Sequence, residues 1–198
     1  MITFDEWRQK YDKMTLEEQV SYHNQLEKLY PEQAHYSYGG IREAFSFAKP
    51  KRVLEFGTWK GDLANLAIPE FQIESWKGIE ICEAAIRNTH CRLPQFSYIM
   101  PPKFDWFIEE RTEEADLIIG THFIEHLSNE HFDKLAEYCH GVKFVYFEAP
   151  LTIDGQDWVG YHGTHKLIYG WRKVEEVMAN NGYKLHNSFH DARFFICE

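Results

Sequence analysis

The sequence predicts one α/β domain, in which a seven-stranded, mostly parallel sheet ends in an antiparallel hairpin and carries helices on both faces. From residue 53 onward, short apolar segments alternate with helix-like segments, which is typical of a parallel sheet. Two last strand-like runs, residues 183–189 and 192–197, have no room for a crossover helix between them and must pair antiparallel. The 198 residues fit a single domain, with a helical N-terminal extension over residues 1–50 and the core over 51–198.

The elements follow from local patterns. In the extension, residues 3–30 carry two helical patterns, the second opened by a capping box of Thr15 and Glu18 and stopped by Pro31. Residues 41–48 predict one more short helix. The remaining strands are expected at residues 53–56, 76–81, 96–100, 116–120 and 142–148. The helices between them are expected at residues 83–89, 104–111, 129–139 and 171–181.

Composition and charge narrow the function classes. The formal net charge is −10, and the 21 Lys and Arg residues are scattered, so we expect no nucleic-acid partner. The four cysteines contain no C-x-x-C pair, which favours reduced thiols over a zinc site or a disulfide framework. No segment could span a bilayer and the N-terminus is charged, so we expect a cytoplasmic protein without membrane association. The sequence defines no oligomeric state.

Residues 52–64 (RVLEFGTWKGDLA) indicate a strand, a tight turn and the start of a helix, the junction where open α/β sheets bind ligands. Glycine allows a sharp turn and a close approach of backbone to ligand. Trp59 stands where a dinucleotide-binding loop would have its middle glycine, so a pyrophosphate is not the expected ligand. The candidate ligand-binding residues of this stretch are Glu55, Gly57, Thr58, Trp59 and Gly61.

This stretch resembles the first motif of the class I S-adenosylmethionine-dependent methyltransferases, which places an acidic residue two before a glycine at the end of the first strand. Three further segments are similar to that family and follow in its order: WKGIEI, ADLIIGTHFIEHL and HKLIYGWRKVEEVMANNGYKL. The resemblance covers residues 53–197. It implies a Rossmann-like fold, S-adenosyl-L-methionine as cofactor and a small-molecule substrate.

The resemblance also implies positions for the site. Glu80, which lies about 20 residues beyond the glycine loop, would accept hydrogen bonds from the ribose, with Ile81 beside it. A solvated glutamate at a strand end is the alternative interpretation. Met100 ends the third strand, where relatives commonly have a carboxylate near the adenine, so a different way of holding the adenine is implied. Thr121 and His122 would lie beside the methyl donor.

Methyl transfer needs mainly alignment, because the sulfonium is already an activated donor. A histidine suits the role of general base when the acceptor is a hydroxyl or an amine, and we rank His122 first and His165 second. Residues 151–163 form a long loop that suits either a substrate-binding lid or a merely packed connection.

Three alternatives stay open at this stage. The string HFIEH is also an inverted zinc-protease motif, but that interpretation needs both histidines within a helix, and here the string follows a strand. For Glu125 and His126 we expect an orienting hydrogen-bond pair at a helix start. A non-catalytic S-adenosylmethionine-binding or partner-binding protein and a nicotinamide-dependent oxidoreductase are the rival functions.

Overall fold

The computed structural model describes residues 18, 21, 25, 38–100, 115–154, 167, 169–189 and 191–198. The strands are β1 (Arg52–Phe56), β2 (Ser75–Ile79), β3 (Phe96–Ile99), β4 (Leu117–Thr121), β5 (Phe144–Glu148), β6 (Tyr183–Ser188) and β7 (Ala192–Cys197). The helices are α3 (Tyr38–Ala48), α4 (Asp62–Phe71), α5 (Glu83–Arg87), the 3-10 helix η1 (Ile124–His126), α6 (Asn129–Cys139) and α7 (Trp171–Asn180).

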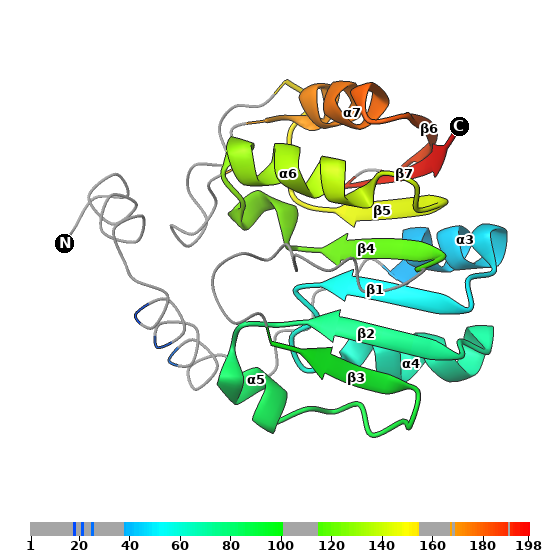
Figure 1. The fold of residues 1–198 in the computed structure, drawn as a ribbon, viewed down its shortest axis with the longest axis vertical. Helices are drawn as coiled ribbons and strands as arrows, with labels where there is room; N and C mark the ends of the chain where they lie inside the picture. Colours follow the sequence, from blue (N-terminus) through cyan, green and yellow to red (C-terminus); the bar gives the residue numbers. More distant parts are fainter. Residues whose placement is uncertain are drawn as a thin grey trace.

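The seven strands form one sheet in the order β3-β2-β1-β4-β5-β7-β6 (Figure 1). The pairs among β1 to β5 are parallel, whereas β7 is antiparallel to both β5 and β6. Six strands therefore run in one direction and β7 runs against them, which confirms the predicted sheet and its hairpin. The carboxyl ends of β1 and β4, where the order of the strands reverses, lie side by side.

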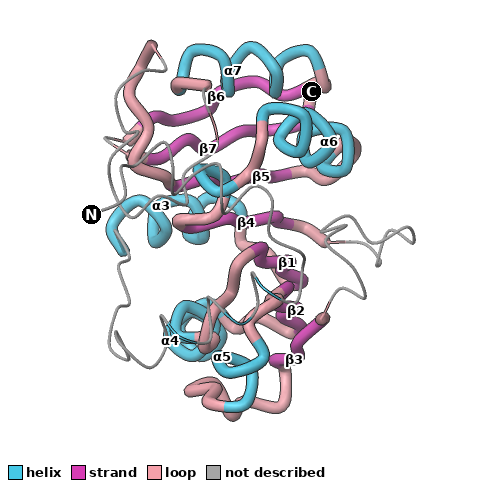
Figure 2. Tube along the Cα trace, turned by 90° about the vertical axis from the view of Figure 1, so that its left-hand side faces the viewer, coloured by secondary structure: helices cyan, strands magenta, loops and turns pink. Residues whose placement is uncertain are grey.

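Helices cover both faces of the twisted sheet, with α3 and α4 on one side and α6 on the other (Figure 2). Side chains alternate along each strand, so β1 contributes to two cores. Val53 packs with residues of α3 and α4, whereas Leu54 and Phe56 pack with residues of α6 and α7. Because helices bury both faces of the sheet, a ligand-binding site is expected at the ends of the strands.

Most boundaries agree with the expectation. Helix α6 and strand β7 have the predicted bounds, and Ser128 caps α6 by accepting a hydrogen bond from the His131 amide at 3.1 Å. Strand β2 ends earlier than predicted, at Ile79, because the N–H groups of Ile81 and Cys82 donate to the Glu80 side chain.

One expectation needs correction. Glu125 and His126 do not start the helix that follows β4. They belong to the one-turn η1, and α6 begins only at Asn129. The predicted helix at residues 104–111 and most of the helical patterns at residues 3–30 lie outside the described residues. Within the part of the chain that the structure describes, no helix is long and apolar enough to cross a membrane.

Candidate functional site

The loop between β1 and α4 passes through three left-handed residues: Gly57 at φ 71°, Trp59 at φ 50° and Gly61 at φ 76°. A Cβ atom at Gly57 would lie 3.1 Å from the Phe123 ring, and one at Gly61 would lie 2.9 Å from Cys91. Both positions therefore favour glycine, for conformation and for space. Trp59 adopts the same region at a cost of about 1–2 kcal/mol.

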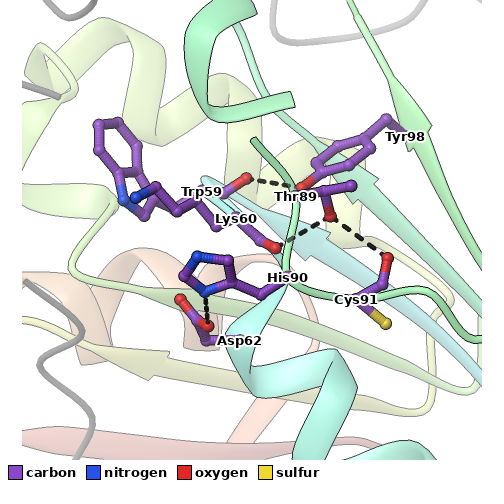
Figure 3. A network of polar contacts seen from close by, with 7 residues as sticks. All are labelled: Trp59, Lys60, Asp62, Thr89, His90, Cys91 and Tyr98. Atoms are coloured by element: carbon purple, nitrogen blue, oxygen red, sulfur yellow. Dashed lines mark hydrogen bonds and ion pairs between the residues drawn. The ribbon is translucent and has the colours of Figure 1, made fainter. Parts of the chain in front are cut away.

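The backbone of this loop is fixed by the end of β3 and by the segment after α5 (Figure 3). The Tyr98 hydroxyl donates to the Trp59 carbonyl at 3.0 Å. The Lys60 carbonyl accepts from the Thr89 hydroxyl at 3.0 Å and from the His90 amide at 2.8 Å. The loop is therefore held in its left-handed course by polar contacts with neighbouring elements. Sequence reasoning missed Tyr98, whose place at a strand end is the only signal the sequence offers.

Glu80 joins the end of β2 to the same loop. Its side chain accepts from the Trp59 amide at Oε2 and from the Ile81 and Cys82 amides at Oε1, each at 2.8 Å. The residue is 5% exposed. Glu80 is thus buried and engaged with backbone amides, unlike the solvated glutamate of the alternative interpretation.

Glu55 is fully buried on the face of the sheet that α3 and α4 cover, the face on which Val53 also lies. Its Oε2 accepts from the Thr58 hydroxyl and from Trp76 Nε1, the latter at 3.0 Å. Its Oε1 has no hydrogen-bond partner within the described residues. Burial raises the pKa of the Glu55 carboxyl to about 7. The predicted residues Glu55 and Thr58 therefore contact each other beneath the loop.

The free energy of unfolding of Glu55→Gln, relative to that of the wild type, should increase as the pH rises. In the wild type, the carboxyl ionises near pH 4.5 when unfolded and near 7 when folded, so stability should fall between those values by about 1.4 kcal/mol per pH unit. Urea unfolding at pH 5 and pH 8 measures the effect. Other groups titrate alike in both proteins, so a difference between Glu55→Gln and wild type that does not change with pH would contradict the raised pKa.

The end of β4 carries Thr121 and His122. The Thr121 hydroxyl is buried and unpartnered within the described residues. His122 has a left-handed backbone at φ 49°, and its amide donates to the Glu148 carbonyl at 2.7 Å. Its side chain is 40% exposed, with Nδ1 3.5 Å from Glu125 Oε1 and Nε2 3.8 Å from Glu148 Oε1. The imidazole thus lies at the surface above two buried carboxyl groups.

These carboxyl groups set the electrostatics of His122. The contact with Glu125 is the main reason that the pKa of His122 is raised, and it outweighs the desolvation that opposes the charge. Burial raises the pKa of Glu125, but contacts with His122 and His126 outweigh it and keep that pKa below its ordinary value. Glu148 in turn accepts from the Tyr146 hydroxyl at 2.8 Å. The cluster therefore favours a protonated imidazole.

The structure brings most of the predicted residues to one edge of the sheet. The Gly57 amide donates to the Ile79 carbonyl at 2.9 Å, and Gly57 abuts Phe123, so the loop meets the ends of both β2 and β4. Met100, just after β3, is 50% exposed. His165 lies outside the described residues. Sequence reasoning missed Glu148, although a carboxylate that ends an apolar strand is a recognisable signal.

The HFIEH string runs from the turn after β4 through η1 and lies in no α-helix, so it lacks the helical placement that the inverted zinc-protease motif requires. Among the residues that the structure describes, no group of three His, Cys, Asp or Glu side chains is placed to hold a metal ion.

Comparison with known proteins gives a likeness of structure. No protein-family model and no curated protein sequence matches the chain. Human N-acetylserotonin methyltransferase, solved in complex with S-adenosylmethionine, is similar with a TM-score of 0.65 and 12% identity over 92% of this chain, which spans 56% of that protein. A S-adenosylmethionine-dependent methyltransferase from Archaeoglobus fulgidus has a TM-score of 0.62 and 20% identity, covering 82% of this chain and 75% of its own.

A TehB-like methyltransferase from Corynebacterium glutamicum matches over nearly its whole length, with a TM-score of 0.62, 12% identity and coverage of 91% of this chain and 98% of that one. At such identities the likeness defines the fold. The chain therefore has the class I, Rossmann-like fold of S-adenosylmethionine-dependent methyltransferases.

Proposed function

We propose that the protein is an S-adenosylmethionine-dependent methyltransferase that acts on a hydroxyl or an amine of a small molecule. The observation that carries the proposal is the link between Trp59 and Glu80, which sets the buried carboxylate at the end of β2 directly against the left-handed loop after β1. This loop lies where the strand order reverses, between β1 and β4, and ligands of open α/β sheets bind there.

The residues at this edge fit such a cofactor. The Glu80 carboxylate is buried directly against the loop, and a carboxylate suits the hydroxyls of a ribose because it is a hydrogen-bond acceptor. The left-handed glycines bring the backbone close to a ligand, and the exposed Met100 offers an apolar contact for the adenine. The bound cofactor would supply an activated methyl group, which leaves alignment and proton removal to the protein.

His122 is the proton acceptor in this proposal, and His165 is the second candidate. The exposed imidazole can reach a substrate, while Glu125 and Glu148 stabilise the imidazolium that forms when it takes a proton. His122 can take up a proton only when its imidazole is deprotonated, so the rate of methyl transfer should rise with pH. Because the contact with Glu125 raises the pKa of His122, this rise in rate should lie at a higher pH than the ordinary histidine pKa would give.

Calorimetric titration with S-adenosylmethionine, S-adenosylhomocysteine and NAD tests the cofactor, and Glu80→Ala tests the site. We expect the substitution to weaken binding of S-adenosylmethionine by about 1.5–3 kcal/mol, because charge-assisted hydrogen bonds to the ribose are lost. It should also lower the free energy of unfolding, since three backbone amides, two of them in buried hydrogen bonds, lose their acceptor. Glu83→Ala is the matched control, because Glu83 is a half-exposed acid on α5 that pairs with Arg87.

An unchanged affinity in folded Glu80→Ala would remove Glu80 from the site. Binding of NAD in preference to S-adenosylmethionine would instead support an oxidoreductase. Release of S-adenosylhomocysteine in the presence of small hydroxyl- and amine-bearing compounds would then test catalysis. Tight cofactor binding without any such release would favour a non-catalytic binding protein.

A further inference from the structure

Trp59 combines a strained backbone with a side chain that has no polar or aromatic partner among the residues that the structure describes. Its φ of 50° is one that residues other than glycine rarely adopt, and its backbone is held there from both sides. The amide donates to Glu80 and the carbonyl accepts from Tyr98. Within the described residues, its partly exposed indole forms no hydrogen bond and no ring contact. Backbone strain persists only where the surrounding structure holds it, and it is found mainly at functional sites.

The direction of the indole indicates what it contacts. In Figure 3 the ring points away from Tyr98 and Thr89. Tyr98 lies on β3, the outer strand beyond β2, where the adenine of the proposed cofactor would lie. The ring therefore does not extend toward the adenine. The loop that carries Trp59 contacts Glu80, which would hold the ribose, and lies against Phe123, the neighbour of His122. The sulfonium, which joins the ribose to the transferred methyl group, would lie between these two points.

We propose that the face of the Trp59 indole contacts the sulfonium of S-adenosylmethionine and makes the protein prefer this charged cofactor to its neutral product. The inference rests on the function proposed above. An aromatic face attracts a cation through its quadrupole, and tryptophan does so most strongly. S-adenosylhomocysteine lacks both the positive charge and the transferred methyl group, so it loses this attraction while it keeps the ribose and adenine contacts.

The preference has a consequence for turnover. A contact that stabilises only the charged form disappears when the methyl group leaves, so the product is held less tightly than the cofactor. Trp59 would thereby favour the exchange of product for new cofactor. A glycine at this position would give a relaxed loop that lacks this discrimination.

The test compares the ratio of the dissociation constants of S-adenosylhomocysteine and S-adenosylmethionine in wild type, Trp59→Phe, Trp59→Leu and Trp59→Gly, measured by calorimetry. We expect the ratio to fall by about 3- to 30-fold in the leucine and glycine variants, and by less in the phenylalanine variant, which retains an aromatic face. Trp59→Gly should unfold at an equal or higher temperature than wild type, because the left-handed backbone no longer carries a side chain.

Gln72→Gly is the matched control. Gln72 has a left-handed φ of 55° at the end of α4, and its carbonyl accepts from Lys51 at the opposite edge of the sheet. The same relief of strain there should leave the ratio unchanged. If both affinities fall equally in Trp59→Leu and Trp59→Gly, or if neither changes, the contact with the sulfonium is refuted. A wild-type protein that binds neither compound would instead refute the proposed function itself.

Discussion

Replacing His122 by alanine is expected to lower turnover by about 10² to 10⁴-fold while the affinity for S-adenosylmethionine changes little, as expected when a general base is removed. Single-turnover assays with an acceptor found by S-adenosylhomocysteine release would measure the loss. The wild-type rate should rise with pH through a pKa above the ordinary histidine value, and the variant should lack this limb.

A change of nearly the same shape that removes a charge beneath the imidazole provides a second readout. Glu125→Gln removes the carboxylate 3.5 Å from His122 Nδ1, which is the main cause of the raised pKa. The rise in rate should therefore move to lower pH in this variant without disappearing. If turnover survives in His122→Ala and vanishes in His165→Ala, the ranking of the two histidines is reversed. If neither substitution affects the rate, alignment alone accounts for catalysis.

Gly57→Val should abolish measurable cofactor binding. The position has φ 71°, and the added Cβ would lie 3.1 Å from the Phe123 ring, so the substitution distorts the loop and displaces the residue next to His122. The backbone cost is about 1–2 kcal/mol, which a stable domain can absorb, and the circular dichroism spectrum should remain that of a folded protein. Calorimetry then reports on binding.

Gly182→Val is the control for the cost of placing a side chain on a left-handed backbone without a steric clash. Gly182 has φ 84°, but a Cβ there would meet nothing within 4 Å, and it lies between α7 and β6. We expect a similar loss of stability and an unchanged cofactor affinity. Normal binding by folded Gly57→Val would show that the loop after β1 is not the cofactor loop.

The sequence was sufficient to predict the sheet, because alternation of strands and helices leaves few topologies and because the absence of a crossover forces the final hairpin. It was insufficient wherever a side chain competes with the backbone ladder. The end of β2 illustrates this limit, since the Glu80 carboxylate takes the Ile81 and Cys82 amides that a longer strand would have paired. The one-turn η1 illustrates a second limit of sequence-based prediction, because so short an element has no detectable periodicity.

For the candidate site, the sequence located the ends of β1, β2 and β4 but not the contacts between them. Glycine spacing predicted the turn, whereas the tie of Tyr98 to Trp59 joins residues that are far apart in the chain. Glu148 approaches His122 only because β4 and β5 are paired in register, with Thr121 opposite Glu148. Such pairings depend on tertiary structure, which local patterns do not contain.

The position of β7 between β5 and β6 also sets an order of events during synthesis. β5 pairs with a strand that follows much later in the chain, with Phe144 opposite Ile196 and Glu148 opposite Ala192. Until residues 192–197 have left the ribosome, this wholly buried apolar strand remains an open edge, which is a template for pairing with other chains. A nascent chain that stalls after β5 therefore keeps this edge exposed, and pairing with β7 ends the exposure.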